Sequence, residues 1–325
     1  MKIGLYIQWN KGSLNQVSGN VLGDELYGES LCYALSKIAG VSNAELYSPN
    51  YLPENKLDAM IYLNDTEPME KYARRHLIYL QNVYPQGSNL ILPKIQQIKY
   101  DGYAFISNKL LDLHMRAGFK GIFLPFGVNT DYFYPRPKNN KFSFETAYIG
   151  NDIKGEQRST DYILPAADFH FGLFGNWQLP YNKKWRMWSP KYWQRNKKYH
   201  RLFSKISNGK IAQENVPVLY SSTAVNINCS HQDCINWDII TLRTYEVLAC
   251  KGFLISDTIP VAEKTMLDCL VFTTGGDDMR SKIRYYLDNE KIRLDIAENG
   301  YEYVLKNASI FSQAKKLYDY LEAII

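Results

Sequence analysis

The sequence of 325 residues lacks the features that mark several large classes of protein. No apolar run approaches the roughly 18 to 20 residues that a membrane-spanning helix needs, so we expect any membrane contact to be peripheral. The five cysteines are odd in number and form no paired framework, and the first ten residues read as a strand rather than a secretory leader. These absences predict a reducing, cytoplasmic location.

The sequence also has no internal repeat and no low-complexity tract. Hydrophobic residues make up 46% and charged residues 22% of the chain, which excludes a disordered polymer or a coiled coil. The length favours two domains, each around its own core. Tyrosine is abundant, with 26 residues, but the net charge of +5 is too dilute over this length to indicate a nucleic-acid partner.

The first 130 residues alternate short apolar runs with segments of helical periodicity, which predicts a parallel sheet with crossover helices. The expected strands are 2–8, 44–48, 58–64, 76–81, 102–107 and 121–125. The expected helices are 21–39, 66–74, 88–99 and 108–117, the last ended by Gly118 as a C-cap. The loop after the first strand lacks the Gly-x-Gly-x-x-Gly pattern, which argues against a dehydrogenase.

Residues 128–143 contain two prolines, three asparagines and several cations, as an exposed connection would, and a second alternation follows. Its expected strands are 144–149, 170–174, 224–228, 253–256 and 271–273, its helices are 159–167, 216–221, 242–250 and 279–287, and the tail 289–325 is helical. We predict a Rossmann-like N-terminal domain at 1–130, a linker at 131–143, a Rossmann-like C-terminal domain at 144–307, and a final helix at 308–325 that packs back on the first domain.

The sharpest motif is Arg243-Thr-Tyr-Glu246-Val-Leu-Ala-Cys250, followed by a Lys-Gly pair and a strand. At this point the sequence resembles the GT-B glycosyltransferases, which carry an Arg, an aromatic residue and a Glu at the start of this helix. The resemblance is in particular to the CgeB-like (spore maturation type) group, within the glycosyltransferase group 1-like family. Other matching segments, in the same order, are 127–135, 147–151 with Arg158, 174–177, and 216–220 before the strand that ends at Asn228. The resemblance implies an α/β GT-B fold, in which two Rossmann-like domains face each other across a cleft and a helical tail follows.

The chemistry of a nucleotide-sugar donor agrees with this motif. Its ribose diol needs a carboxylate acceptor, which Glu246 can supply, and its diphosphate needs cations or helix N-termini. Arg243 lies three residues earlier and so on the same helix face. The alternative is an ordinary surface pair worth about 0.2–0.5 kcal/mol. The remaining substrate-binding candidates, which the resemblance implies, are Gly19 in the loop after the first strand and, on the donor side, Asn151, Arg158, Gly175, Asn176, Trp177, Lys210, Asn228, Thr244 and Tyr245.

Three acidic residues are the catalytic candidates. The resemblance implies a role for Asp238 near the donor sugar, because retaining GT-B enzymes place two acidic residues eight positions apart, as Asp238 and Glu246 are. Asp24 and Glu25 are candidates for the general base on an acceptor hydroxyl. Their alternative is an interaction with the dipole of the first helix.

Two further segments have competing interpretations. Cys229, His231 and Cys234 have no regularly spaced fourth ligand, and the resemblance implies catalysis without a metal, so we expect a polar loop, no metal and no cofactor besides the donor. Residues 182–205 interleave Lys and Arg with six aromatic residues and contain no acidic residue. This segment suits an anionic membrane surface or a charged glycan, or else it packs on its own domain.

The combined prediction is a glycosyltransferase that moves a sugar from a nucleotide diphosphate to a hydroxyl of a cell-envelope glycan or a lipid-linked acceptor. Peripheral contact with the inner face of the membrane and no nucleic acid are expected. Two alternatives stay open at this point. One is a non-catalytic protein of the same fold that binds an anionic envelope polymer or partner through residues 182–205, and the other is a nucleotide-sugar epimerase.

Overall fold

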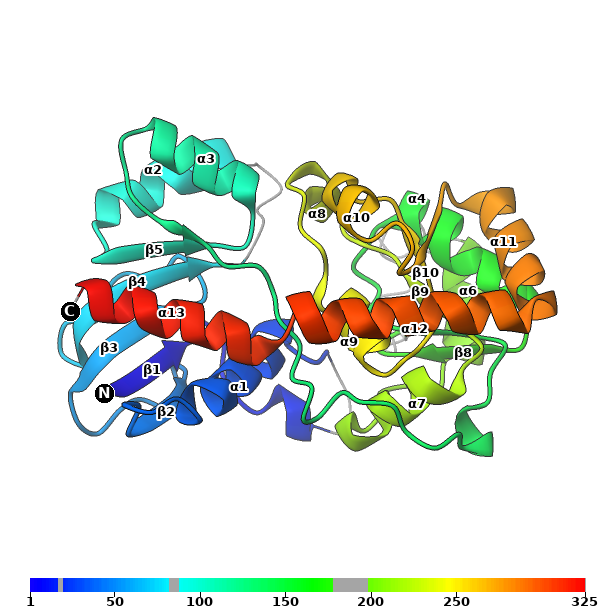
Figure 1. Cartoon of the computed structure of the whole chain (residues 1–325), viewed down its shortest axis with the longest axis horizontal. Helices are drawn as coiled ribbons and strands as arrows, with labels where there is room; N and C mark the ends of the chain where they lie inside the picture. The colour runs from blue at the N-terminus through cyan, green and yellow to red at the C-terminus, as the bar shows by residue number, and fades with distance from the viewer. Residues whose placement is uncertain (17–19, 82–87, 178–197, 325) are drawn as a thin grey trace, which may run out of the picture.

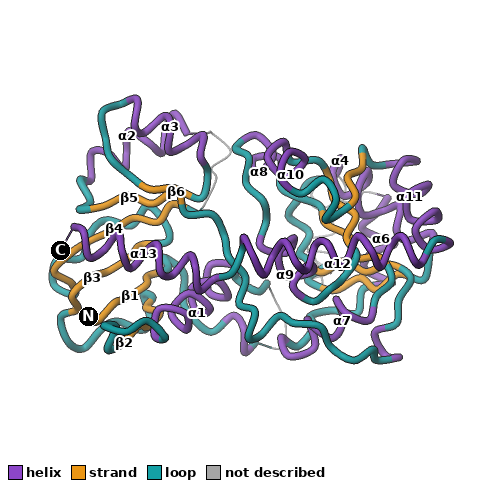
Figure 2. Tube along the Cα trace, in the orientation of Figure 1, coloured by secondary structure: helices purple, strands orange, loops and turns teal. Residues whose placement is uncertain are grey.

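The computed structural model describes residues 1–16, 20–81, 88–177 and 198–324. Two sheets, each with its own helices, lie at the two ends of an elongated molecule (Figure 1). Figure 2 shows that the strands gather into these two separate groups. In the part of the chain that these ranges cover, no helix is long and apolar enough to cross a bilayer.

The N-terminal sheet has six strands in the order β2-β1-β3-β4-β5-β6, and neighbouring strands pair in parallel. The strands are β1 (Lys2–Tyr6), β2 (Asn43–Tyr47), β3 (Leu57–Tyr62), β4 (Ala73–Leu80), β5 (Gly102–Phe105) and β6 (Ile122–Phe123). The connecting helices are α1 (Gly23–Ser36), α2 (Ser88–Ile98) and α3 (Asn108–Arg116). Gly118, with φ +88°, follows α3 as the C-cap pattern predicts.

The predicted helix at 66–74 is wrong. Residues 66–72 form an irregular connection, and β4 begins at Ala73. Pro68 has no N–H to contribute to a helix. Two tyrosines bind the neighbouring backbone instead, since the Tyr62 hydroxyl accepts from the Met69 N–H and the Tyr100 hydroxyl donates to the Thr66 carbonyl.

The C-terminal sheet has five parallel strands in the order β11-β10-β9-β7-β8. They are β7 (Thr146–Ile149), β8 (Phe171–Phe174), β9 (Val225–Asn228), β10 (Leu254–Asp257) and β11 (Val271–Thr273). The longer helices are α6 (Lys198–Ile206), α7 (Val216–Ser222), α9 (Leu242–Ala249), α11 (Gly276–Asp288) and α12 (Glu290–Asn307). The helix predicted at 159–167 is a run of mixed helical geometry made of α4 (Glu156–Arg158), η3 (Ser159–Ile163) and η4 (Leu164–Asp168). Helix α6 and the short helices α8 (Gln232–Asn236) and α10 (Pro260–Thr265) were not predicted.

The final helix, α13 (Ile310–Ile324), lies on the N-terminal sheet and contacts α1 (Figure 1). The chain returns beside the linker, where the Val128 N–H donates to the Ala308 carbonyl and the Ile310 N–H donates to the Val128 carbonyl. Ile310, Ala314, Leu317 and Leu321 are fully buried in the core that contains β1 and β3. The two halves are therefore joined by two adjacent crossings of the chain.

Because Leu317 is buried in that core, we expect Leu317→Ala to lower the free energy of unfolding by about 2–5 kcal/mol. The matched control is Lys316→Ala, an exposed neighbour on the same helix, which should change it by no more than about 0.5 kcal/mol. Urea unfolding measures both variants, and equal effects would show that α13 does not contribute to the N-terminal core.

Candidate active site

A cavity of about 270 Å³ lies between the two halves of the chain. On the N-terminal side its wall comes from the start of α1, at Val21, Gly23 and Leu26. On the C-terminal side it comes from the loops after β7 and β8, the segment 210–213, and the helices α7 and α9. The carboxyl ends of parallel strands therefore meet at this cavity, as expected of a ligand site in an α/β protein.

Glu246 supplies a buried carboxylate to the cavity wall. The side chain, on α9, is 6% exposed, and the Tyr220 hydroxyl donates to its Oε2 at 3.4 Å. Its Oε1 has no hydrogen-bond partner among the described residues. Burial raises the pKa of Glu246 to about 7, against the opposing effect of the Arg243 charge. A buried carboxylate oxygen without a partner is an acceptor that a ligand hydroxyl can satisfy.

Three cationic side chains face the same cavity, from three different segments. Arg243 donates to the Asn228 Oδ1 at 2.8 Å, and its guanidinium carbon lies 4.9 Å from the centre of the Tyr148 ring. Lys210 donates through Nζ to the Ser13 and Gln16 carbonyls, at 2.6 Å each. These contacts make Lys210 a bridge from the C-terminal half to the loop after β1.

Lys154 is the third cation, and sequence reasoning missed it. Lys154 lines the cavity, and no other described side chain or carbonyl forms a hydrogen bond or ion pair with it. Burial lowers the pKa of its ammonium, and the nearby Arg243 charge acts in the same direction. The sequence contains no signal that separates this lysine from an exposed one.

Two glycines bring the ends of β7 and β8 together. Gly175 has φ +120°, and a Cβ on it would lie 2.1 Å from the Gly150 carbonyl oxygen, so no other residue fits. The Gly175 N–H donates to the Gly209 carbonyl at 2.8 Å, and the Asn176 N–H donates to Asn151 Oδ1 at 3.0 Å. This close contact positions Asn151 and the segment that carries Lys210 at the cavity.

The cavity includes five of the predicted donor-side residues: Asn151, Gly175, Lys210, Arg243 and Glu246. Thr244 and Tyr245 do not line it, because successive residues of a helix turn by about 100°, and both are buried behind Glu246. Trp177 is also buried, with its ring 5.0 Å from that of Phe203.

Asn176 lies outside the cavity and joins the two halves through its Nδ2, 3.0 Å from Asn20 Oδ1. Gly19 falls outside the described residues.

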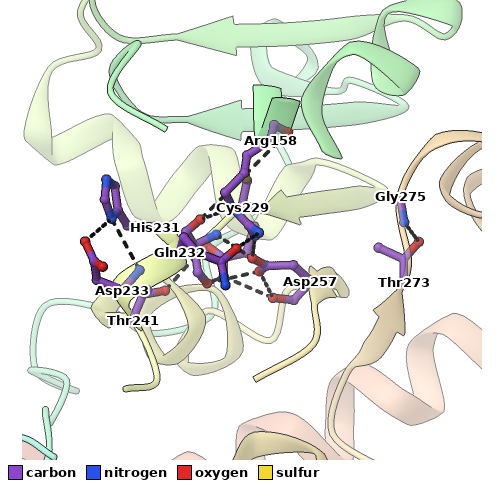
Figure 3. Close-up of polar contacts among 12 residues, drawn as sticks. Arg158, Cys229, His231, Gln232, Asp233, Thr241, Asp257, Thr273 and Gly275 are labelled. Atoms are coloured by element: carbon purple, nitrogen blue, oxygen red, sulfur yellow. Dashed lines mark hydrogen bonds and ion pairs between the residues drawn. The ribbon is translucent and has the colours of Figure 1, made fainter. Parts of the chain in front are cut away.

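Arg158 and Asn228 lie behind the cavity wall rather than on it. Arg158 forms an ion pair with the fully buried Asp257, and its Nε donates to the Ser230 carbonyl at 2.7 Å (Figure 3). Asn228 is fully buried and contacts Arg243. The guanidinium of Arg158 thus binds partners within the protein, whereas Lys154, four residues earlier, lines the cavity.

Comparisons with known proteins agree with this geometry. Residues 159–319, just under half of the chain, match a family model described as glycosyl transferase-like. A search of curated proteins found no match. HepE (Alr3699) of Anabaena, solved with UDP-glucose, superposes with a TM-score of 0.67 at 11% identity, over 99% of this chain and 100% of that one.

Sucrose-phosphate synthase from Thermosynechococcus elongatus gives a TM-score of 0.63 at 16% identity, over the whole of both chains. The BGT protein of phage T4, solved with UDP-glucose, gives 0.61 at 13% identity, over 99% of each chain. The fold is GT-B. This part of the sequence prediction is confirmed, while assignment to the CgeB-like group stays a prediction.

Within the GT-B frame, Asp238 does not line the cavity but lies at a contact between the two halves. Its Oδ2 forms an ion pair with Lys109 Nζ of α3 at 2.8 Å, and its backbone has φ +55°. The flanking Trp237 and Ile239 pack into cores of the N-terminal half. Asp238 therefore helps to join the two halves, and the catalytic role that the resemblance implies for it has no support in the geometry.

Glu25 and Asp24 differ in what their carboxylates contact. Glu25 is 2% exposed, and it accepts from the N–H groups of Gly12 and Ser13 and from the Ser13 hydroxyl. Glu25 therefore holds the loop that Lys210 also binds. Asp24 is half-buried beside the cavity-lining Gly23, and its Oδ2 accepts from Asn64 at 3.2 Å. Asp24 is the more accessible of the two candidates.

Most of the basic aromatic segment 182–205 falls outside the described residues. Its described end belongs to α6, where Tyr199 and Phe203 are buried and His200 pairs with Asp152 at 2.7 Å. In the loop after β9, Cys229 is buried and His231 lies beside Asp233 at the start of α8 (Figure 3). The described end of the basic segment and Cys229 pack on their own domain, whereas Cys234 packs against the core of the N-terminal half.

The raised pKa of Glu246 predicts a stability that depends on pH. The value rises from an ordinary 4.5 to about 7 in the folded protein, so the folded state holds this proton more tightly than the unfolded chain. The associated stability is complete below pH 4.5 and is lost as the pH rises toward 7, at a cost on the order of 3 kcal/mol.

We therefore expect Glu246→Gln to be more stable than the natural protein at pH 8, with most of the difference gone at pH 5. Urea unfolding of both proteins at the two pH values measures this change. A difference that does not vary with pH would contradict the burial of an ionisable carboxyl at this position.

Proposed function

We propose that the protein is a glycosyltransferase that binds a nucleoside diphosphate sugar in the cavity between its domains. The observation that supports this most directly is the partnerless Oε1 of Glu246, which lies in the same cavity wall as Lys154, Lys210 and Arg243. A buried acceptor beside several cations matches a ligand that carries both a diol and a diphosphate. The nucleotide sugars bound by HepE and BGT are of this chemical class.

In this proposal, Glu246 accepts hydrogen bonds from the ribose hydroxyls. Charge-assisted hydrogen bonds of this kind are worth about 1.5–3 kcal/mol each. The bond also removes the cost of leaving Oε1 unsatisfied. Because burial favours the neutral acid, a ribose that donates to the carboxylate restores its ionised form.

The cations supply the charge that a departing nucleoside diphosphate needs. When the bond from the anomeric carbon to the phosphate oxygen breaks, negative charge grows on the diphosphate, and nearby fixed cations stabilise it. Lys154, Lys210 and Arg243 suit this task because each lines the cavity. We propose that they serve without a metal ion or other cofactor.

The acceptor side of the proposal rests on the N-terminal half. Asp24 is our candidate for the base that takes the proton from an acceptor hydroxyl, with Asn64 holding its carboxylate. A hydroxyl of a glycan or of a lipid-linked sugar is the proposed acceptor. The envelope-glycan role, the cytoplasmic location and the peripheral membrane contact are predictions from the sequence.

Calorimetric titration with UDP, GDP, ADP and UDP-glucose tests the donor proposal. We expect one nucleoside diphosphate to bind at micromolar to millimolar concentration, and absence of binding by all of them at millimolar concentration would refute the proposal. Detection of a glycosylated product then separates transfer from binding alone. Conversion of the free nucleotide sugar to its epimer would instead identify an epimerase.

The role of Glu246 predicts a second result in the same assay. Glu246→Gln keeps the size of the side chain but removes the charge from the acceptor, so we expect the Kd of the bound nucleotide to rise roughly tenfold to a hundredfold. Glu214→Gln is the matched control, because Glu214 is exposed and does not line the cavity. Equal affinities of the two variants would rule out the ribose contact.

A further inference from the structure

A continuous chain of buried hydrogen bonds runs behind the cavity wall from Arg158 to Arg243. Arg158 pairs with Asp257, and Asp257 Oδ1 accepts from the hydroxyls of Ser230 at 3.0 Å and Ser256 at 3.1 Å. Both hydroxyl oxygens accept from the Nδ2 of Asn228, at 3.2 and 3.0 Å. Asn228 Oδ1 in turn accepts from Arg243 at 2.8 Å. Figure 3 shows Arg158 and Asp257 at the start of this chain.

The charge at Asp257 determines the direction of every later hydrogen bond. An ionised carboxylate can only accept hydrogen bonds, so the hydroxyls of Ser230 and Ser256 must each donate their one hydrogen to Asp257. The serine oxygens can then only accept from Asn228, which turns its NH₂ toward them. The carbonyl of the Asn228 amide is thereby left to face Arg243, which is the one orientation in which Asn228 can hold a guanidinium.

Burial prevents water from substituting for any of these partners. Asp257, Asn228 and Ser230 are fully buried, and Ser256 is 2% exposed. Asp257 Oδ2 also accepts from the Ser230 N–H at 2.9 Å, so the carboxylate is held by donors on both oxygens. If the direction of one hydrogen bond in the chain is reversed, the next hydrogen bond must reverse as well, because an unpaired polar group at such a buried site is costly.

We propose that Asp257 is a positioning residue that aims Arg243 into the cavity through Ser230, Ser256 and Asn228, without contacting the ligand itself. This inference rests on the proposed function in so far as Arg243 binds the diphosphate. Arg158 takes part as the counter-charge of Asp257. The serines and Asn228 thus connect the buried ion pair of Arg158 and Asp257 to Arg243, which lies on a different segment of the chain.

Asp257→Asn tests the direction of the chain, because it keeps the shape and removes the charge. The new amide carbonyl faces Arg158 and the Ser230 N–H, both of which are donors, so its NH₂ faces the serine hydroxyls. Those hydroxyls then donate to Asn228, whose amide turns over and presents NH₂ to Arg243. Two donors face each other, and Arg243 leaves its position.

In calorimetric titration of the full chain with UDP, we expect Asp257→Asn to raise the Kd about tenfold or more. Asp278→Asn is the matched control, because Asp278 follows the neighbouring strand β11, accepts from Thr273 and Thr274 and pairs with Lys282 but has no link to Arg243. The Ser230→Ala/Ser256→Ala double variant keeps the ion pair and removes the relay. This double variant should raise the Kd in the same direction, even if Asp257→Asn does not fold.

A double-mutant cycle separates positioning from general damage. In an Arg243→Gln background, Asp257→Asn should change the Kd of UDP by less than about twofold, because its effect passes through Arg243. Additive losses in the cycle, or an unchanged Kd in the single variant, would overturn the proposal.

A crystal structure of ligand-free Asp257→Asn provides a readout that does not need the nucleotide. Loss of the contact between Arg243 and Asn228 supports the relay, and an unmoved Arg243 overturns it. If the natural protein bound no nucleoside diphosphate, the proposed function would fail while this structure still decided the positioning role.

Discussion

The parallel direction of the strands is the constraint on which the site depends. In both sheets, all neighbouring strands run the same way, so the chain leaves every strand at one edge of its sheet. The residues at these exits must satisfy backbone groups that no further strand will pair. Gly150 and Gly175 do so by donating their N–H groups to the Phe174 and Gly209 carbonyls, and Asp257 does so with its carboxylate, which accepts from the Ser230 N–H. The polar side chains at the cavity are therefore a product of the sheet topology.

The cavity wall contains charged side chains with atoms that lack partners among the described residues. Glu246 keeps one oxygen without a partner and Lys154 has no counter-charge among the described residues, whereas Glu25, Arg158 and Asp257 are fully engaged nearby. An unsatisfied buried polar group needs an explanation, and at a cavity wall a ligand that completes it is one. The contrast between engaged and unengaged charges distinguishes the residues that hold the site together from those that face its contents.

The sequence predicted the strands well, because each is a short apolar run. It placed Arg243 and Glu246 on one helix face because they are three residues apart, and their role at a ligand site was implied by the resemblance to GT-B glycosyltransferases. It failed at 66–74, where distant tyrosine hydroxyls bind the backbone. It also chose Arg158 over Lys154. Both are cations after β7, but the Ser230 carbonyl and Asp257, 72 and 99 residues after Arg158, bind Arg158 and not Lys154. Thr244 and Tyr245 were included with their neighbours although the helix turns them away from the cavity.

The return of α13 to the first sheet has a consequence for the order in which the protein is made. The core around β1 and β3 contains Ile310, Leu317 and Leu321, so it lacks part of its apolar surface until these residues leave the ribosome. The C-terminal sheet, whose core ends at Ala308, has all its parts earlier. Domains generally fold from the N-terminus during synthesis. In this chain the half that is synthesised first is the last to be completed.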